Sequence, residues 1–114
     1  MPPLFVVRSP FPRGKLKEYI LGDRGFVKAV VDVQKKIMTI GGDLHADGEQ
    51  VLLQEGSRQE DLWGINLHPE ESAERWIEFD SMINIRPQQG NRSRHVEDPA
   101  LQTEIQSIVT SLIP

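Results

Sequence analysis

Hydrophobic and polar residues alternate with a period of two in several stretches of the chain. Apolar, largely β-branched residues fill much of 27–33, and after a polar break they return at 37–40. A further alternating stretch covers residues 63–67 and ends before Pro69. This period is typical of strands with a buried face. The pattern therefore predicts a hairpin over residues 27–40, although no Asn-Gly turn marks it, and a separate strand at 63–67.

Two more segments are predicted to be strands. Between residues 76 and 86 the odd positions are mostly apolar and the even positions mostly polar. This is long for one strand, so we expect a bulge near Ser81. Residues 4–8 consist of four apolar residues followed by Arg8, and the prolines at 10 and 12 break the chain after them. This segment is predicted to be an edge strand.

Helical spacing appears in three other places. Residues 15–20 carry apolar side chains on one helical face, and Gly22 is placed to end that helix. Asp47 with Gln50 resembles a capping box before a short helix that stops at Gly56. Near the C-terminus, Asp98 and Pro99 supply an N-cap and a first-turn proline. The apolar stripe that follows predicts an amphipathic C-terminal helix, and it consists of Leu101, Ile105, Ile108, Val109, Leu112 and Ile113.

This order of elements predicts an α+β fold with an antiparallel sheet of about four main strands and helices packed on one face. Residues 1–14 are expected to be a Pro-rich N-terminal extension, and residues 15–114 a single domain. The full length of 114 residues suits one such domain. Its core is large enough to need no disulfide or structural metal.

Composition narrows the classes of function. Cysteine is absent, which excludes thiolate nucleophiles and sulfur-based metal sites. The longest apolar run has four residues, so no membrane segment is expected and a cytoplasmic location is predicted. A formal net charge of −4 argues against a generally basic surface for nucleic acids.

One face of the predicted sheet is a candidate site. If the apolar sides of the later strands face the helices, the opposite side is polar. It would carry Asn66, His68, Glu78, Asp80, Asn84 and Arg86. The ordinary interpretation is a solvated sheet surface with cross-strand ion pairs, and the alternative is a binding surface.

The loop at residues 86–95 is a second candidate. It holds three arginines and no acidic residue, whereas the rest of the chain has ten basic and seventeen acidic residues. Arginine forks suit phosphate and carboxylate oxygens, and the loop has no aromatic residue for base stacking. The predicted ligand-binding residues are Arg86, Asn91, Arg92 and Arg94. Nucleic-acid binding is open only at this loop, and the arginines could equally bridge to the protein's own acids or line a homo-oligomer interface.

Metal and catalytic chemistry have weaker support. Asp43, His45 and Asp47 alternate as metal ligands would in an extended segment, but Asp47 also serves as a helix cap. A hydrolase could use His45 or His95 as base, with a carboxylate from the strand face. Glu78 and Asp80 are the candidates for that carboxylate. No serine lies in a nucleophile elbow, so the residues leave open whether the chain is an enzyme and whether it needs a cofactor.

Four stretches taken together carry a family resemblance: GGDLHADGE, QEDLWGINLHP, WIEFDSMINIRP and GNRSRHVEDP. They resemble a small prokaryotic family catalogued as a domain of unknown function, over roughly residues 26–113. The resemblance implies neither an activity nor a role for any residue.

Three hypotheses of different classes follow. The first is a module that binds a phosphate, a nucleotide or an acidic partner through the arginine-rich loop. The second is a small phosphodiesterase or ribonuclease-like hydrolase, and the third a homo-oligomeric interaction protein without a ligand. The anion-binding module ranks first because an ordinary globular domain does not explain the uneven charge distribution.

Overall fold

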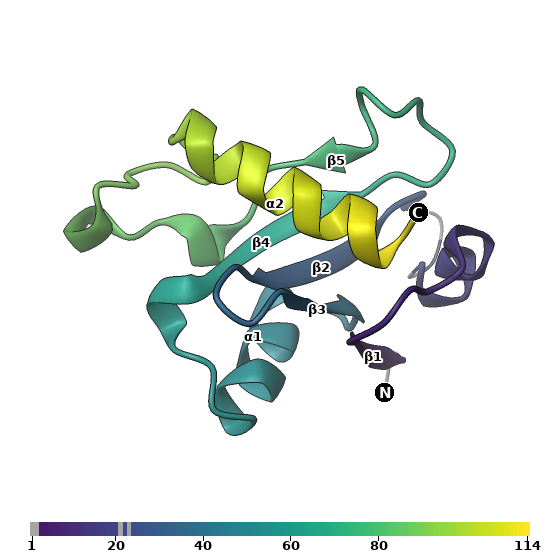
Figure 1. The fold of residues 1–114 in the computed structure, drawn as a ribbon, viewed down its shortest axis with the longest axis horizontal. Helices are drawn as coiled ribbons and strands as arrows, with labels where there is room; N and C mark the ends of the chain where they lie inside the picture. The colour runs from purple at the N-terminus through teal and green to yellow at the C-terminus, as the bar shows by residue number, and fades with distance from the viewer. Residues whose placement is uncertain (1–2, 21, 23) are drawn as a thin grey trace.

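The computed structural model describes residues 3–20, 22 and 24–114, and these form an α+β fold around a five-stranded antiparallel sheet (Figure 1). The strand order is β1-β3-β2-β4-β5. The strands are β1 (Leu4–Val7), β2 (Val27–Asp32), β3 (Ile37–Gly41), β4 (Leu62–Leu67) and β5 (Ile77–Glu78). The α-helices are α1 (His45–Gln54) and α2 (Pro99–Leu112). Short 3-10 helices lie at η1 (Arg13–Tyr19), η2 (Gln59–Asp61), η3 (Met82–Asn84) and η4 (Pro87–Gln89). The predicted fold class is confirmed.

The hairpin of β2 and β3 is closed by an aspartate. Asp32 is fully buried, and its Oδ1 accepts hydrogen bonds from the backbone N–H groups of Gln34 and Lys35, each 2.9 Å long. Its Oδ2 accepts a 2.5 Å bond from the Ser57 hydroxyl. Lys36 takes the left-handed conformation with a φ of 58°. The side chain of Asp32 therefore stabilises the turn of this hairpin, which has no Asn-Gly pair.

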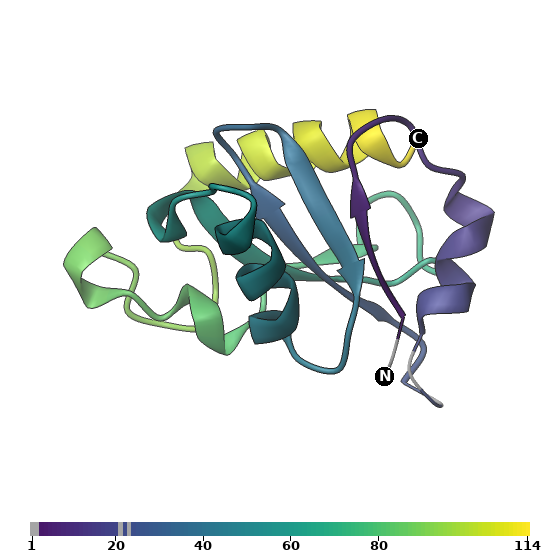
Figure 2. The same ribbon diagram turned by 90° about the horizontal axis from the view of Figure 1, so that it is seen from below.

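The two α-helices cover opposite faces of the sheet (Figure 2). On one face α2 packs on the largest apolar cluster, which includes Ala29 and Met38. On the other face, the backbone of α1 at Gly48 lies against Val30 and Thr39. We expected all helices on one face. The central strands are apolar at both odd and even positions, so each face needs its own cover.

The chain leaves the sheet earlier than the alternating pattern of residues 76–86 predicts, and β5 has only two residues. The side chain of Asn84 replaces the missing strand: its Oδ1 accepts from the Gly64 N–H at 2.8 Å, and its Nδ2 donates to the Gly64 carbonyl at 3.0 Å. Beyond Ser81, where a bulge was expected, the chain turns into η3. Side-chain amides satisfy the β4 backbone here, so no long strand is required.

Side-chain caps mark the N-terminal ends of both α-helices. The Asp98 side chain accepts from the Ala100 N–H at 2.9 Å, which confirms the predicted start of α2. Helix α1 begins two residues before Asp47, whose Oδ2 accepts from the N–H groups of Asp43 and Leu44. The predicted first helix is the 3-10 helix η1. It ends at Tyr19, before the expected end at Gly22, because the backbone of Ile20 is already extended.

Candidate ligand-binding site

Polar side chains gather on the face of the sheet that carries α1, beyond the start of that helix. The register places Lys28 of β2 opposite Asn66 of β4, and Asn66 opposite Glu78 of β5. Other members come from α1, from residues that follow β4 and β5 directly, and from the arginine-rich loop. This polar sheet surface consists of Lys28, His45, Asn66, His68, Glu78, Asp80 and Arg94.

Asn66 lies at the centre of this surface and is 5% exposed. Its Nδ2 donates to Glu78 Oε1 at 3.0 Å and to the Asp80 carbonyl at 3.2 Å. The Asp80 carbonyl can only accept a hydrogen bond, and so can the ionised Glu78 carboxylate. The amide nitrogen of Asn66, and not its oxygen, therefore faces them. Its Oδ1 is buried and has no hydrogen-bond partner among the described residues. The surface thus contains one unused acceptor.

His45 begins α1 and is 7% exposed. Its Nε2 lies 2.8 Å from the Ile65 carbonyl, which can only accept, so Nε2 carries the hydrogen. Burial lowers the pKa of His45 to about 4, and the charges of Lys28, Asp80 and Arg94 act on the same ring. At neutral pH the imidazole is therefore uncharged and lies among charged neighbours.

Lys28 is half-buried on the same surface. Burial and then the positive charges of Arg24 and Arg94 lower the pKa of its ammonium group, and the carboxylates of Asp43 and Asp80 offset part of that shift. These arginines have carboxylates of their own: Arg24 lies 3.7 Å from Asp43, and Arg94 Nε lies 2.6 Å from Asp80. Among the described residues, Lys28 has no carboxylate within 4 Å.

The carboxylates of the surface are held in defined positions. The hydrogen bond from Arg94 holds the pKa of Asp80 below its usual value. Glu78 Oε1 receives Asn66 Nδ2 and lies 3.1 Å from His68 Nε2. The structure therefore brings together three of the four catalytic candidates, His45, Glu78 and Asp80. The fourth, His95, lies apart: it packs against Phe79 and contacts Gln102 of α2.

Arg86 has a structural position inside the molecule. It is 4% exposed, and its guanidinium donates to the carbonyls of Gln59, Leu62 and Ile83. The same group lies 4.3 Å from the centroid of a ring of Trp63. Burial lowers the pKa of Arg86. Its donors are directed to these backbone carbonyls and to the Gln89 side-chain oxygen, and away from solvent.

The side chain of Asn91 forms hydrogen bonds with the backbone in and around the arginine-rich loop. Its Nδ2 donates to the carbonyls of Asn84, Ser93 and His95, and its Oδ1 accepts from the Glu97 N–H. Four backbone groups thus converge on one buried amide. The geometry assigns Asn91 to holding the loop in shape.

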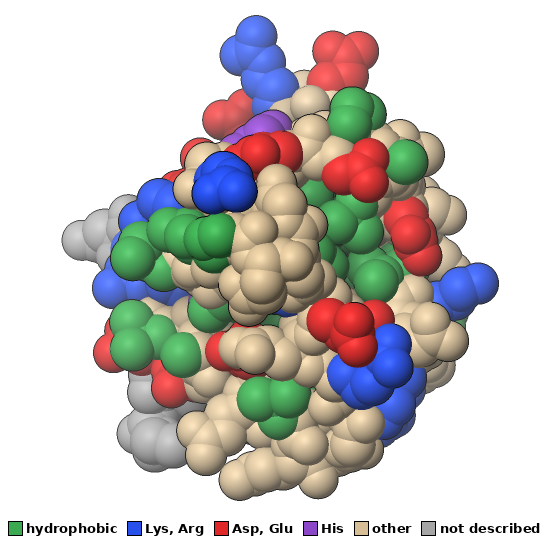
Figure 3. Space-filling model, turned by 90° about the vertical axis from the view of Figure 1, so that its left-hand side faces the viewer, with side chains coloured by type: hydrophobic (Ala, Val, Ile, Leu, Met, Phe, Trp, Pro, Cys, Tyr) green, Lys and Arg blue, Asp and Glu red, His purple; other side chains and the backbone are tan. Residues whose placement is uncertain are grey.

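The backbone donors of the loop already hold a carboxylate. Glu97 Oε2 accepts from the Ser93 hydroxyl at 2.7 Å and from the N–H groups of Arg92 and Ser93 at 3.0 and 2.9 Å. The hydroxyl bond, followed by the backbone bonds, lowers the pKa of Glu97. Viewed from this end of the molecule, acidic and basic side chains are interspersed (Figure 3). The loop's positive charge therefore does not form a broad basic patch there.

A family model described as a protein of unknown function, DUF5674, matches residues 5–112. The chain belongs to this family. The resemblance predicted over residues 26–113 is confirmed, and the match also includes most of β1. No match was found among curated proteins or among solved structures.

The metal ligands predicted for this DUF5674 protein have other partners. Asp47 accepts backbone hydrogen bonds, His45 bonds to Ile65, and Asp43 lies near Arg24. Within residues 3–20, 22 and 24–114 there is no group of three or more His, Cys, Asp or Glu side chains arranged to hold a metal ion. In the same ranges, no helix is both long and apolar enough to cross a membrane.

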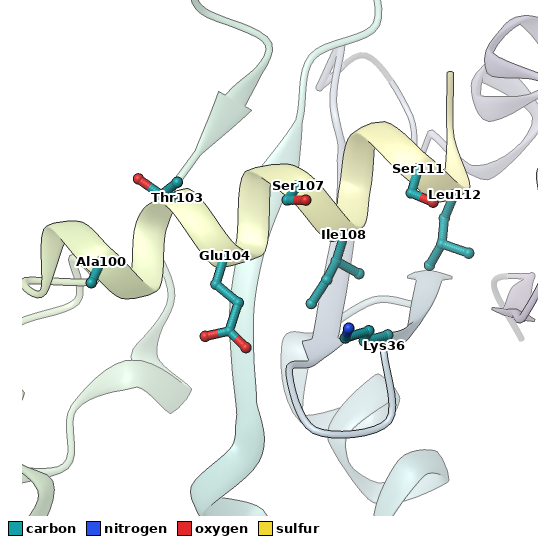
Figure 4. A pocket seen from close by; sticks show the side chains of 8 residues that line it. All are labelled: Lys36, Ala100, Thr103, Glu104, Ser107, Ile108, Ser111 and Leu112. Carbon is teal, nitrogen blue, oxygen red and sulfur yellow. The ribbon is translucent and has the colours of Figure 1, made fainter.

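Two hollows bear on the choice of site in the DUF5674 fold. A groove of about 460 Å³ runs along α2 beside Lys36, with Ile108 and Leu112 pointing toward that lysine (Figure 4). It contains none of the predicted site residues. A hollow of about 360 Å³ adjoins the polar sheet surface, and its lining includes His68, Glu78 and Arg75.

Lys28 is the member of this surface whose importance the sequence analysis missed. Its position within the apolar run 27–31 was an available signal, because a lysine in an otherwise buried strand is costly unless it is partnered.

Proposed function

We propose that this protein binds a small anionic ligand, bearing a phosphate or carboxylate group, on the polar sheet surface. Lys28 is the principal cation of the proposed site, and Arg94 lies beside it. Arg92 is exposed two residues earlier in the same loop and adds a further positive charge. Arg86 and Asn91 contribute by holding that loop in shape.

The observation that carries the proposal is the ammonium of Lys28, which has no carboxylate within 4 Å among residues 3–20, 22 and 24–114. The group is partly removed from water and flanked by Arg24 and Arg94, which already have carboxylates. An anion placed against it would offset both burial and repulsion. The hollow of about 360 Å³ beside His68 and Glu78 adjoins this surface, but neither Lys28 nor Arg94 lines it, so the ligand is placed on the open surface over β2 and β4.

The site supports binding better than hydrolysis. A phosphodiesterase-like reaction needs a base whose pKa is close to the working pH. With a pKa of about 4, His45 is unprotonated at neutral pH but is a weak base. If the hydrolase interpretation is correct, RNA or bis(p-nitrophenyl) phosphate will be turned over, with or without Mg²⁺, Mn²⁺ or Zn²⁺, and His45→Asn will abolish turnover.

The binding proposal can be tested by titrating the ¹⁵N-labelled protein with phosphate, pyrophosphate, AMP and citrate. We expect amide shifts on β2, β4 and the 92–94 segment. Lys28→Met should weaken binding by about 10- to 100-fold, the usual worth of a charge-assisted hydrogen bond. Lys17→Met is the matched control, because Lys17 is an exposed lysine in η1.

Affinity should also fall as the pH rises through the lowered pKa of Lys28, because only the ammonium form attracts an anion. Arg94→Gln should weaken binding, and the double variant with Arg92→Gln should weaken it further. The absence of a shift with all four anions would contradict the proposal. So would equal affinity in the Lys28→Met and Lys17→Met variants.

A further inference from the structure

Strand β1 leaves an open edge of the sheet. It is the outermost strand, and within the described part of the chain it pairs only with β3, with Leu4 opposite Gly41 and Val7 opposite Met38. The Gly42 N–H donates to the Pro3 carbonyl at 2.9 Å, which shows that residue 3 faces β3. Alternate residues of an antiparallel strand face the same neighbour. Leu4 and Val6 therefore direct their backbone N–H and C=O groups outward.

This edge lacks the features that usually protect an outer strand. Residues Leu4–Val7 contain no charge, no proline and no bulge, and Phe5 is 45% exposed. By contrast β5, at the other edge, has only two residues and ends on Glu78. An exposed apolar edge with unpaired backbone groups is a template for another strand.

An apolar groove follows the same edge on the α1 side. It has a volume of about 460 Å³, and its apolar walls are Leu4, Leu44 and Val51. Leu44 is 58% exposed. A strand added beside β1 would cover the backbone edge and also shield these side chains.

We propose that the occupant of this edge is a second copy of the same chain, with the two β1 strands pairing antiparallel across a two-fold axis at Phe5. In this register Leu4 lies opposite Val6 of the second copy, so the outward-facing residues of both strands meet. Phe5 meets its own copy as a close, non-hydrogen-bonded pair. The two sheets join into one, and the contact is isologous.

Charge complementarity favours a second copy in this orientation. Arg8 follows β1 and pairs with Glu55 at the C-terminal end of α1, where the Lys35 ammonium donates to the Glu55 carbonyl at 3.1 Å, so two cations and one carboxylate leave this end positive. Asp43 and Asp47 lie at the opposite end of the groove, beside Leu4, and Arg24 lies 3.7 Å from Asp43, so two carboxylates and one cation leave that end negative. Antiparallel pairing brings the basic end of each strand to the acidic end of the other, twice per dimer. Such an arrangement selects both partner and register.

The first measurement is sedimentation equilibrium of the full chain from about 1 µM to about 1 mM, because a contact of this size belongs to the weak class of interfaces. We expect a reversible monomer–dimer equilibrium. Hydrogen exchange should slow at the amides of Leu4 and Val6 as the dimer forms. Val6→Pro should abolish dimerisation while retaining the fold, because it removes a donor that does not face β3.

A charge exchange tests the register. Arg8→Glu alone places like charges at both ends of the contact, and so does Asp43→Lys alone, so each variant should be monomeric. An equimolar mixture should form a heterodimer, in which both end contacts are again between opposite charges. The two substitutions break only exposed ion pairs, which contribute little to folding.

A wild-type chain that stays monomeric at about 1 mM would overturn the proposal, and the edge would then be available to an extended peptide of another protein. A dimer that persists in Val6→Pro, or that dissociates in neither charge variant, would place the contact on another surface. Because Lys28 lies on β2, inward of β3, none of these results depends on whether an anion binds.

Discussion

Arg86 shows how burial decides what a charged residue can do in this protein. Its guanidinium is enclosed by three backbone carbonyls and the Trp63 ring, and it joins η2, the start of β4 and η3. The flat shape of the group allows several donors to act at once. Arginine is a residue type typical of anion-binding sites, but at this position its hydrogen bonds stabilise the fold.

Arg86→Lys should destabilise the protein by about 2–4 kcal/mol, because a lysine keeps the buried charge but cannot serve three carbonyls in one plane or stack on Trp63. Urea unfolding followed by Trp fluorescence measures the change. Arg92→Lys is the control, since Arg92 is exposed, and its stability should change by less than about 0.5 kcal/mol. Equal effects of the two substitutions would count against this role.

His45 should make the protein sensitive to mild acid. Its pKa is about 4 in the folded chain and near 6.5 when unfolded, so between these values the unfolded state binds more protons. The free energy of unfolding therefore keeps its full value above about pH 6.5 and decreases by about 3 kcal/mol as the pH falls to about 4. Urea unfolding at pH 7, 6, 5 and 4 should show this loss in the wild type. His45→Gln should lack that part of it, and parallel curves would contradict the prediction.

At the scale of elements, α1 approaches the sheet more closely than an ordinary helix can. Its contact point is Gly48, where an added Cβ would lie 2.3 Å from Thr39 Oγ1 and 3.1 Å from Val30 Cγ2. Glycine in a helix interior costs about 1 kcal/mol relative to alanine. Close packing of the helix on the β2–β3 hairpin outweighs that cost, which explains a glycine where helix propensity disfavours one.

Gly48→Ala should therefore destabilise the protein by about 1–3 kcal/mol despite the better helix propensity of alanine. Thr39→Ala removes the nearest clashing atom, a hydroxyl oxygen with no partner in the described structure. The double variant should recover much of the loss, which a double-mutant cycle of unfolding free energies would reveal. Additive effects of the two substitutions would show that the contact does not limit the helix position.

At the scale of the whole molecule, the two proposed functions occupy different parts of one sheet. The polar sheet surface extends over β2, β4 and β5, whereas the open edge belongs to β1, on the far side of β3. Dimerisation through β1 would leave that surface uncovered. The arrangement suits a protein in which each copy carries its own ligand site.

Anion affinity should thus be nearly independent of the dimer. Phosphate titrations of the wild type and of Val6→Pro should give dissociation constants within about twofold of each other, as expected for separate sites. Lys28→Met, in turn, should leave the monomer–dimer equilibrium unchanged. A large effect of either substitution on the other property would show that the sites are coupled.

The sequence by itself determined the α+β class, the β2–β3 hairpin, β4 and the C-terminal helix. Their evidence is local: alternation along a strand, and a cap with an apolar stripe along a helix. It also placed Asn66, Glu78 and Asp80 on one polar face. Those assignments need only neighbouring residues, so one sequence was enough to make them.

Only the tertiary structure decided which polar groups have partners. Asn84 replaces a strand by bonding to Gly64, twenty positions away, and Glu97 occupies the donors of the arginine-rich loop. Arg86 is used by carbonyls from distant segments, whereas Lys28 has no carboxylate within 4 Å among the described residues. Hydrophobic periodicity indicates which residues of a helix or strand lie on its buried face. Which donor meets which acceptor depends on how the whole chain packs.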